Sequence, residues 1–203
     1  MKQNINCPCG NNLTIEYDEE IDLDANPQEL DKILNGSFMS YDCSGCDKRH
    51  KPEYKIMIKW DSKKLKMEVL PEMERGEFYR KKENLNYEVV IGFPEMTDRL
   101  AVIKDNLEPV IIETLKSYLY AKAEENYPDK DVNVWYYCNG PEGIEFHIDG
   151  IRDNEVAVMR IPLSLYNKTL EDYRRQPKSE SFTSLQVRSY LSVQNILRHD
   201  LLK

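Results

Sequence analysis

Apolar side chains recur along this chain with two different periods, and each period predicts a different kind of element. Between residues 56 and 69, apolar and polar positions alternate, which is typical of two half-buried strands joined by the turn 61–64. Alternation returns further on in three segments, 132–138, 143–151 and 155–162, which short polar turns separate. We therefore expect a hairpin in the first part of the chain and an antiparallel meander in the second.

Other segments show the helical spacing of about 3.6 residues between apolar positions. A short helix is expected at 26–35, where Pro27 suits the first turn and Gly36 follows the last helical residues. Longer apolar stripes predict four more helices, which span 97–106, 107–126, 163–175 and 184–202. Thr97 is the expected N-terminal cap of the first of these four.

This mixture of strand and helix periods predicts the α+β class. We expect an N-terminal β module with an inserted short helix at residues 1–72. A C-terminal α+β region at 85–203 is expected to contain the antiparallel meander and several helices. The polar segment 73–84 is the candidate linker between them, with a surface helix as the alternative.

Composition narrows the class of protein. Of the 203 residues, 40% are hydrophobic and 32% are charged, and no apolar run approaches the roughly 20 residues that span a bilayer. The start of the sequence has no apolar signal segment, so we expect a cytoplasmic protein whose thiols are reduced. A formal net charge of -8 argues against non-specific nucleic-acid binding, which depends mainly on neutralising phosphates.

The charges are distributed unevenly along the N-terminal part. Residues 16–31 include eight acids and no base, whereas residues 48–66 include eight Lys or Arg and only two acids. We interpret these segments as two solvated faces of opposite charge that attract each other. The basic segment contains the lysines of the predicted hairpin, which are Lys55, Lys59, Lys63, Lys64 and Lys66.

The most specific chemical signal is a set of four cysteines in two close pairs. Cys7 and Cys9 lie in "CPCG", and 33 residues separate them from Cys43 and Cys46 in "CSGC". Structural zinc sites use four such thiolates in a closed tetrahedron, and a glycine beside each pair permits a tight turn. The pairs therefore predict a structural zinc site in a zinc-ribbon-like module. The rival chemistry is a dithiol–disulfide centre, in which Cys7 and Cys9 would close a small, strained ring.

The residues around these cysteines resemble the CpXC domain family of bacteria and archaea, which is named for paired Cys-Pro-x-Cys motifs around an inserted helix. The resemblance covers residues 4–75 and is carried by "CPCG", "ELDKILNGSFMSYDC", "CSGC" and "PEYKIMIKWDSKKLKMEVLPE". Residues 86–170, with "RLAVIKDNLEPVIIETLK" and "IPLSLY", resemble the region that accompanies this domain. The resemblance implies a metal-binding N-terminal domain.

Two departures from the family pattern affect the predicted site. The first motif is one residue short, Cys-Pro-Cys, so its turn must be tighter, and the second has Ser44 in place of proline. His50, four residues after Cys46, is a possible replacement for one thiolate ligand. We interpret it instead as a surface residue of the basic segment.

Two weaker candidate sites lie in the C-terminal region. Glu145, His147 and Asp149 share one face of a predicted strand, an arrangement that any half-exposed antiparallel strand produces. Cys138 ends an aromatic strand, and we expect it to be buried. The sequence contains no glycine-rich phosphate loop, nucleophile elbow or His-Glu-x-x-His motif, so we predict no catalytic residue.

The sequence thus favours a zinc-binding protein with a structural tetracysteine site that serves as a protein-interaction or adaptor module. Its partner is expected to be another protein, and no membrane is expected. Nucleic-acid binding through the basic hairpin 48–66 is the alternative, although the net charge disfavours it. An enzyme whose site lies in the C-terminal region, where the sequence does not identify it, is a further alternative.

Overall fold

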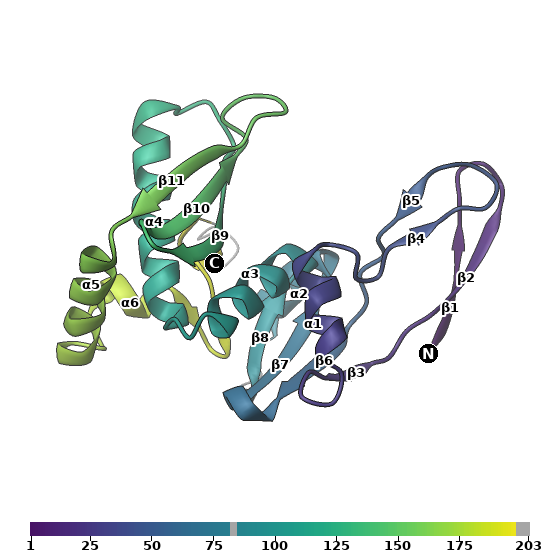
Figure 1. The fold of residues 1–203 in the computed structure, drawn as a ribbon, viewed down its shortest axis with the longest axis horizontal. Coiled ribbons are helices and arrows are strands. Elements are labelled where there is room, and N and C mark those ends of the chain that lie inside the picture. The colour runs from purple at the N-terminus through teal and green to yellow at the C-terminus, as the bar shows by residue number, and fades with distance from the viewer. Residues whose placement is uncertain (82–84, 198–203) are drawn as a thin grey trace. The chain divides into compact units, whose positions relative to one another are not determined.

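The computed structural model describes residues 1–81 and 85–197 (Figure 1). Contacts divide the chain into two compact units, Met1–Thr97 and Asp98–Lys203, and each is described by itself. Helices and strands occur in both units, so the predicted α+β class is confirmed. No helix in the described part of the chain combines the length and apolar character that crossing a membrane requires.

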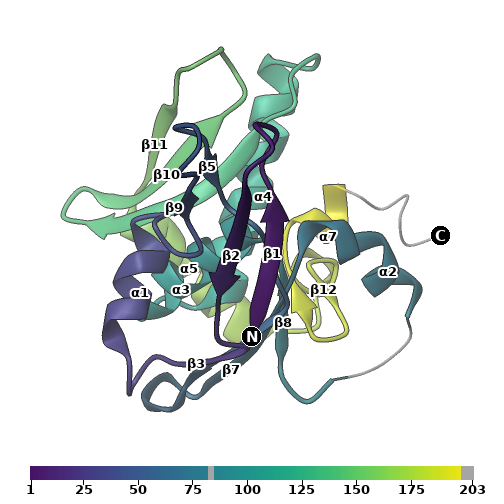
Figure 2. The same cartoon turned by 90° about the vertical axis from the view of Figure 1, so that its right-hand side faces the viewer.

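Two β-hairpins form a ribbon in the first unit, which we call the two-hairpin ribbon. β1 (Lys2–Asn6) and β2 (Asn12–Glu16) form one antiparallel hairpin, and β4 (Tyr41–Asp42) and β5 (Arg49–His50) form the other. The hairpins lie side by side in Figure 1, and Figure 2 shows β1 running along β2. Few side chains of β1 and β2 are buried, so the ribbon has little apolar core.

A mixed sheet forms the other part of the first unit. Its strands follow the order β8–β7–β6–β3, with the bounds Glu88–Ile91, Leu65–Leu70, Ile56–Trp60 and Glu20–Asp22. β6 and β7 are the predicted hairpin, and its turn contains η1 (Asp61–Lys63) and the left-handed residue Lys64. The pairs β3–β6 and β7–β8 are parallel. The predicted short helix is α1 (Pro27–Leu34), which follows β3 and buries Ile33.

The predicted linker 73–84 is helical in its first part. η2 (Glu72–Glu74) and α2 (Arg75–Arg80) occupy this stretch, whereas residues 82–84 lie outside the described residues. Arg75 is buried, and its guanidinium donates to the carboxylates of Glu72 and Glu95 at 2.6 and 2.7 Å. The domain boundaries 1–72 and 85–203 stay a prediction.

The helix predicted at 97–106 begins earlier than expected. α3 spans Phe93–Lys104, and Pro94 lies in its first turn, where a missing N–H removes no helical hydrogen bond. The prediction of Thr97 as the cap is therefore wrong. Thr97 lies inside α3, and its hydroxyl donates to the carbonyl oxygen of Ile33 at 3.5 Å.

The second unit is built around the predicted antiparallel meander. The order of its strands is β11–β10–β9, with the bounds Ala157–Ile161, Gly143–Asp149 and Asn133–Gly140. α4 (Pro109–Asn126) contacts both β9 and α5 (Leu163–Arg175). Fully buried side chains of α4 and β10, such as Ile111, Leu115 and Phe146, belong to one hydrophobic core. The periods of 2 and about 3.6 residues therefore predicted these elements correctly.

The helix predicted at 184–202 is wrong. The described part of this stretch follows α6 (Glu180–Thr183) and contains β12 (Gln186–Val187), β13 (Tyr190–Leu191) and α7 (Gln194–Leu197), whereas residues 198–202 lie outside the described residues. A short hairpin takes the place of the helix, and the side-chain amide of Asn195 donates to the carbonyls of Leu185, just before β12, and Tyr190, on β13, at 2.8 and 3.1 Å. The apolar residues of this stretch therefore reach the hydrophobic core of the second unit from an irregular backbone and not from one continuous helix.

Candidate metal centre

The first cysteine pair lies in the turn between β1 and β2. The backbone N–H of Cys7 donates to the carbonyl of Asn11 at 2.8 Å, and the N–H of Gly10 donates to the carbonyl of Cys7 at 2.9 Å. Gly10 has a φ of 89°, a backbone conformation that residues with a Cβ rarely adopt. The short Cys-Pro-Cys motif therefore forms a closed turn that presents the side chains of Cys7 and Cys9 at one end of the hairpin.

The second pair lies in the turn between β4 and β5. The N–H of Cys43 donates to the carbonyl of Lys48 at 3.0 Å, which closes the loop that also contains Cys46. The two turns approach closely, because a Cβ added at Gly45 would lie 3.2 Å from the Cβ of Asn11. A larger residue at position 45 would push the turns apart.

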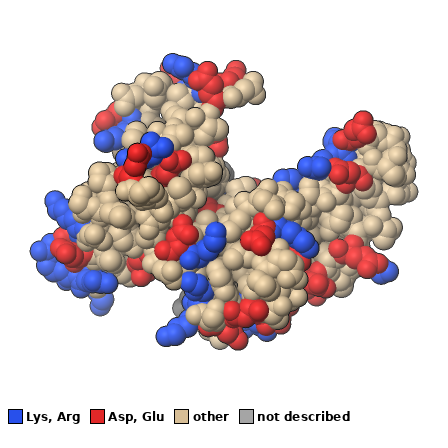
Figure 3. Space-filling model, viewed as in Figure 1, with Lys and Arg blue, Asp and Glu red and all other residues tan. Residues whose placement is uncertain are grey.

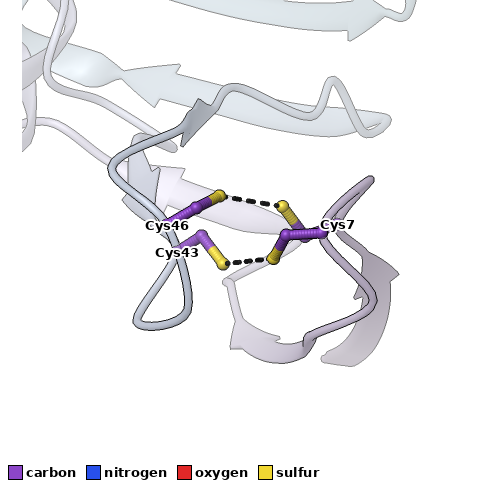
Figure 4. A group of neighbouring side chains, drawn as sticks. Cys7, Cys43 and Cys46 are labelled. Carbon is purple, nitrogen blue, oxygen red and sulfur yellow. Dashed lines mark hydrogen bonds between the residues drawn. The ribbon is translucent and has the colours of Figure 1, made fainter.

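The four sulfur atoms converge between the two turns. Figure 4 shows Cys43 and Cys46 on one loop, with their sulfurs directed toward the turn that contains Cys7. The sulfurs of Cys7 and Cys46 are 3.6 Å apart, and those of Cys9 and Cys43 are also 3.6 Å apart. All four lie within 4.8 Å of one another. Both of these 3.6 Å contacts run between the two hairpins.

The spacing of the sulfurs fits a single metal ion. Sulfurs at the corners of a tetrahedron around zinc, with bonds of about 2.3 Å, would lie about 3.8 Å apart, close to the 3.6 Å observed. A disulfide bond would require about 2.05 Å, and all five cysteines are free thiols in the structure. Four cysteines placed in this way could bind a metal ion.

Hydrogen bonds and burial set the charge state of the sulfurs. The side-chain amide of Asn11 and the backbone N–H of Gly45 donate to the sulfur of Cys43 at 3.5 and 3.4 Å. These two bonds, the one from Asn11 foremost, lower the pKa of Cys43 to about 6, which favours its thiolate form.

The pKa of Cys7 is shifted in the opposite direction, upward. The backbone N–H of Cys9 lowers its pKa, but burial and the neighbouring sulfurs of Cys9, Cys43 and Cys46 raise the pKa to about 12. Cys7 is only 4% exposed, so water cannot stabilise its thiolate. A cation among the sulfurs would supply the missing stabilisation, since metal binding releases protons from its thiol ligands.

The structure brings together the four cysteines named from the sequence and leaves His50 out of the group. His50 lies on β5, and its Nε2 is buried with no hydrogen-bond partner among the described residues. Sequence reasoning missed Asn11, the residue that hydrogen-bonds a sulfur from the opposite hairpin. Its only signal was a polar residue immediately after the first motif.

The weaker candidates in the second unit form a cross-strand cluster. His147 stacks on Tyr137 with ring centroids 3.9 Å apart, and its Nε2 lies 3.1 Å from a carboxylate oxygen of Glu145. Cys138 pairs with Glu145 in the strand register. Burial, followed by the nearby Glu145 and Asp105, raises the pKa of Cys138, which is the reverse of an activated nucleophile.

Most lysines of the predicted basic hairpin have a partner in the first unit. These lysines lie against a carboxylate at 2.6–2.7 Å or over an aromatic ring at 5.3–5.7 Å from the centroid. In Figure 3, basic and acidic side chains are interspersed over the visible face of the first unit. The pairs are Lys55–Glu68, Lys59–Glu20, Lys63–Trp60 and Lys66–Tyr87.

Comparison with known proteins supports the resemblance around the cysteines. Residues 5–116 match the family described as CpXC protein. The chain is also similar to an uncharacterized protein of Treponema pallidum (strain Nichols), with 29% identity over 214 aligned positions that cover 95% of this chain and 97% of the relative. No solved structure matches the chain.

Proposed function

The chain belongs to the CpXC protein family, and we propose that it is a zinc-binding protein whose four clustered cysteines hold one structural ion. The observation that carries this proposal is the crosswise spacing of 3.6 Å between sulfurs of opposite hairpins. Soft thiolates in a tetrahedral set select zinc or iron, and zinc is the usual ion of ribbon-like structural sites. The ligands are Cys7, Cys9, Cys43 and Cys46.

The proposed role of the site is structural. Four cysteine ligands leave no position for water or a substrate, so the site has no place for Lewis-acid chemistry on a bound molecule. The two-hairpin ribbon needs a crosslink because its strands bury few apolar side chains. A bound zinc ion would supply that crosslink, and its binding free energy would contribute to folding of the ribbon.

We further propose that the ribbon and the adjoining sheet form a protein-interaction or adaptor module, with another protein as the partner. Two observations support a binding role. A metal among the four clustered cysteines would occupy all their thiolates, and the raised pKa of Cys138 keeps that thiol from acting as an activated nucleophile. The cytoplasm is the proposed location, because a reducing compartment keeps cysteine thiols available to a metal.

Metal analysis of the purified protein tests the zinc proposal. We expect about one equivalent of zinc per chain, and replacement by cobalt should produce thiolate-to-cobalt charge-transfer bands and the visible bands of a tetrahedral site. Cys43→Ser and Cys46→Ser should each lose most of the metal. Cys138→Ser is the matched control, because this thiol lies outside the sulfur cluster, and it should keep the full equivalent.

Two results would contradict the proposal. Stoichiometric iron in place of zinc would overturn the identity of the metal. Equal metal content in Cys43→Ser, Cys138→Ser and the parent would show that the ion binds elsewhere, whatever its identity.

A further inference from the structure

A cavity of about 480 Å³ lies in the first unit, beside the two-hairpin ribbon. Its walls come from the end of β2, from β3 and α1, and from the segment 37–41 that leads into β4. We propose that this cavity binds a basic segment of the partner protein, with a Lys or Arg side chain inserted into it. The inference rests on the proposed function, because the ribbon supplies two of the walls.

Aromatic and sulfur-containing side chains form the less polar walls of the cavity. Tyr17 stacks on Tyr54, with ring centroids 4.4 Å apart and planes inclined by 8°, so its position is fixed. The hydroxyl of Tyr41 donates to the backbone carbonyl of the last residue of β2 at 3.1 Å. Phe38 and Met39 are buried and complete this surface. Aromatic walls of this kind attract ammonium and guanidinium groups and contact their aliphatic stems.

The charged residues that line the cavity are mainly acidic. Four carboxylates, those of Glu16, Asp18, Glu20 and Glu29, line the cavity together with a single base, Lys32, which pairs with Glu29 at 2.7 Å. Glu16 and Glu20 make ion pairs with lysines, but both carboxylates are more than half exposed, so these pairs are weak and can exchange partners. Asp18 takes part in no ion pair within the described chain. A cationic ligand therefore complements the site.

The occupant is a protein segment because the negative charge continues past the cavity. The acidic stretch 16–31 includes further exposed carboxylates that do not line it. These residues are Glu19, Asp22, Asp24 and Asp31. Hydrogen bonds from the hydroxyl and backbone N–H of Ser62 lower the pKa of Asp24, which keeps that carboxylate ionised. A polypeptide with several basic residues can contact this whole acidic surface. Its side chains also have the aliphatic or aromatic groups that pack against the apolar walls of the cavity.

The metal centre and the cavity share structural elements. Tyr17 directly follows β2, the second strand of the hairpin that carries Cys7 and Cys9, and Tyr41 lies two residues before Cys43. Tyr41 also joins the two hairpins through its hydrogen bond to β2. Removal of the ion should therefore loosen two walls and weaken ligand binding.

Fluorescence anisotropy with a defined peptide tests the inference on the full-length, zinc-loaded protein. The probe is a fluorescein-labelled octapeptide of alternating Arg and Leu, and the matched peptide alternates Glu and Leu. We expect the Arg-Leu peptide to bind and the Glu-Leu peptide not to bind. The double variant Glu16→Gln, Asp18→Asn should weaken binding about tenfold, because two of the complementary charges are lost.

Matched variants separate the cavity from the general acidity of the protein. Glu124→Gln, Glu125→Gln removes the same charge from exposed positions of α4 and should leave the affinity unchanged. Tyr17→Leu should weaken binding about threefold through loss of the ring face, whereas Tyr17→Phe should retain it. Equal weakening by both double variants, or no binding of the Arg-Leu peptide to the parent, would overturn the inference.

Two further readouts complete the test. Spermidine, a cation without apolar side chains, should displace the peptide only weakly; displacement at concentrations equal to those of unlabelled peptide would contradict a protein partner. Zinc content is measured on the same samples. One equivalent of zinc without peptide binding would reject the cavity inference alone, whereas absence of zinc would reject the proposed function.

Discussion

Asn11 connects the two hairpins of the ribbon at the level of single atoms. Its side-chain nitrogen lies 3.5 Å from the sulfur of Cys43 and 3.0 Å from the hydroxyl of Ser44, both on the opposite hairpin. Hydrogen bonds of this kind orient the ligand atoms of a metal site and stabilise their anionic form. Asn11 is therefore a positioning residue for Cys43, and Ser44, which replaces the proline of the family motif, is its second partner.

Asn11→Ala should weaken zinc binding by about tenfold, because partners of metal ligands typically contribute 10- to 100-fold to affinity. The variant keeps the Cβ that lies beside Gly45 of the second turn, so the effect reports the lost hydrogen bonds. Competition with a chromophoric chelator measures the affinity. Asn12→Ala, at the neighbouring exposed position on β2, is the control and should bind zinc like the parent. Equal affinity of the Asn11 variant and the parent would exclude the positioning role.

Sequence reasoning could place the cysteines together but could not reach their partners. Two tight pairs near turn-forming residues indicate one shared site, because few other arrangements use four thiols at such spacing. The crosswise approach of Cys7 to Cys46 depends on how the hairpins face each other, which local spacing does not specify. Asn11 was missed for a related reason: asparagine is common in turns, so its presence alone does not indicate a sulfur partner.

At the scale of elements, local periodicity predicted helices and antiparallel strands that are close in the sequence. α4 and the meander β9–β10–β11 follow their apolar patterns because their apolar side chains are buried in the same core. The parallel pairs β3–β6 and β7–β8 were not predicted, because a strand pattern does not identify a distant partner. The segment with the hairpin β12–β13 was mistaken for a helix because its backbone bonds to distant side chains: Arg99 donates to the carbonyl of Leu191, and Glu113 accepts from the N–H of Val193.

Buried charges connect the elements of the second unit. Lys116 on α4 donates to the carboxylates of Asp98 and Glu113 at 2.5 and 2.9 Å, and these side chains are almost completely buried. Asp98 accepts a hydrogen bond from the N–H of Tyr136, and Glu113 accepts one from the N–H of Val193. Burial disfavours the ammonium of Lys116, but the two carboxylates outweigh it and raise the pKa of this residue. The network joins α3, α4, β9 and the C-terminal segment.

Lys116→Met should destabilise the second unit by about 3–5 kcal/mol, because it leaves Asp98 buried without its cation and leaves Glu113 with only Arg99, at 3.7 Å. The substitution keeps the length and apolar stem of the side chain, so lost packing contributes little. Urea unfolding followed by circular dichroism measures the free energy of unfolding. Lys122→Met, at an exposed position of the same helix, is the control and should change stability by less than about 0.5 kcal/mol. Similar stabilities for the two variants would contradict the proposed role of the network.

At the scale of the whole molecule, the two compact units rest on different kinds of stabilisation. The second unit has a hydrophobic core that includes side chains from α4, from all three strands of the meander and from α5. In the first unit, the sheet buries apolar residues of β6, β7 and β8, whereas the ribbon beside it exposes most of its side chains. Dependence on a metal should therefore be confined to the ribbon and the segments attached to it.

Removal of the metal by a chelator should therefore unfold the chain in part. At a zinc concentration about 100 times the dissociation constant, binding adds about 2.7 kcal/mol to the stability of the state that binds, so amide exchange in the ribbon should become about 100-fold faster without zinc. Hydrogen–deuterium exchange with mass spectrometry should show this change in residues 2–16 and 41–50, and protection of α4 and β10 should persist. Cys43→Ser should reproduce the pattern without chelator. Simultaneous loss of protection in the ribbon, α4 and β10 would mean that the two units unfold as one, and that zinc stabilises the entire chain.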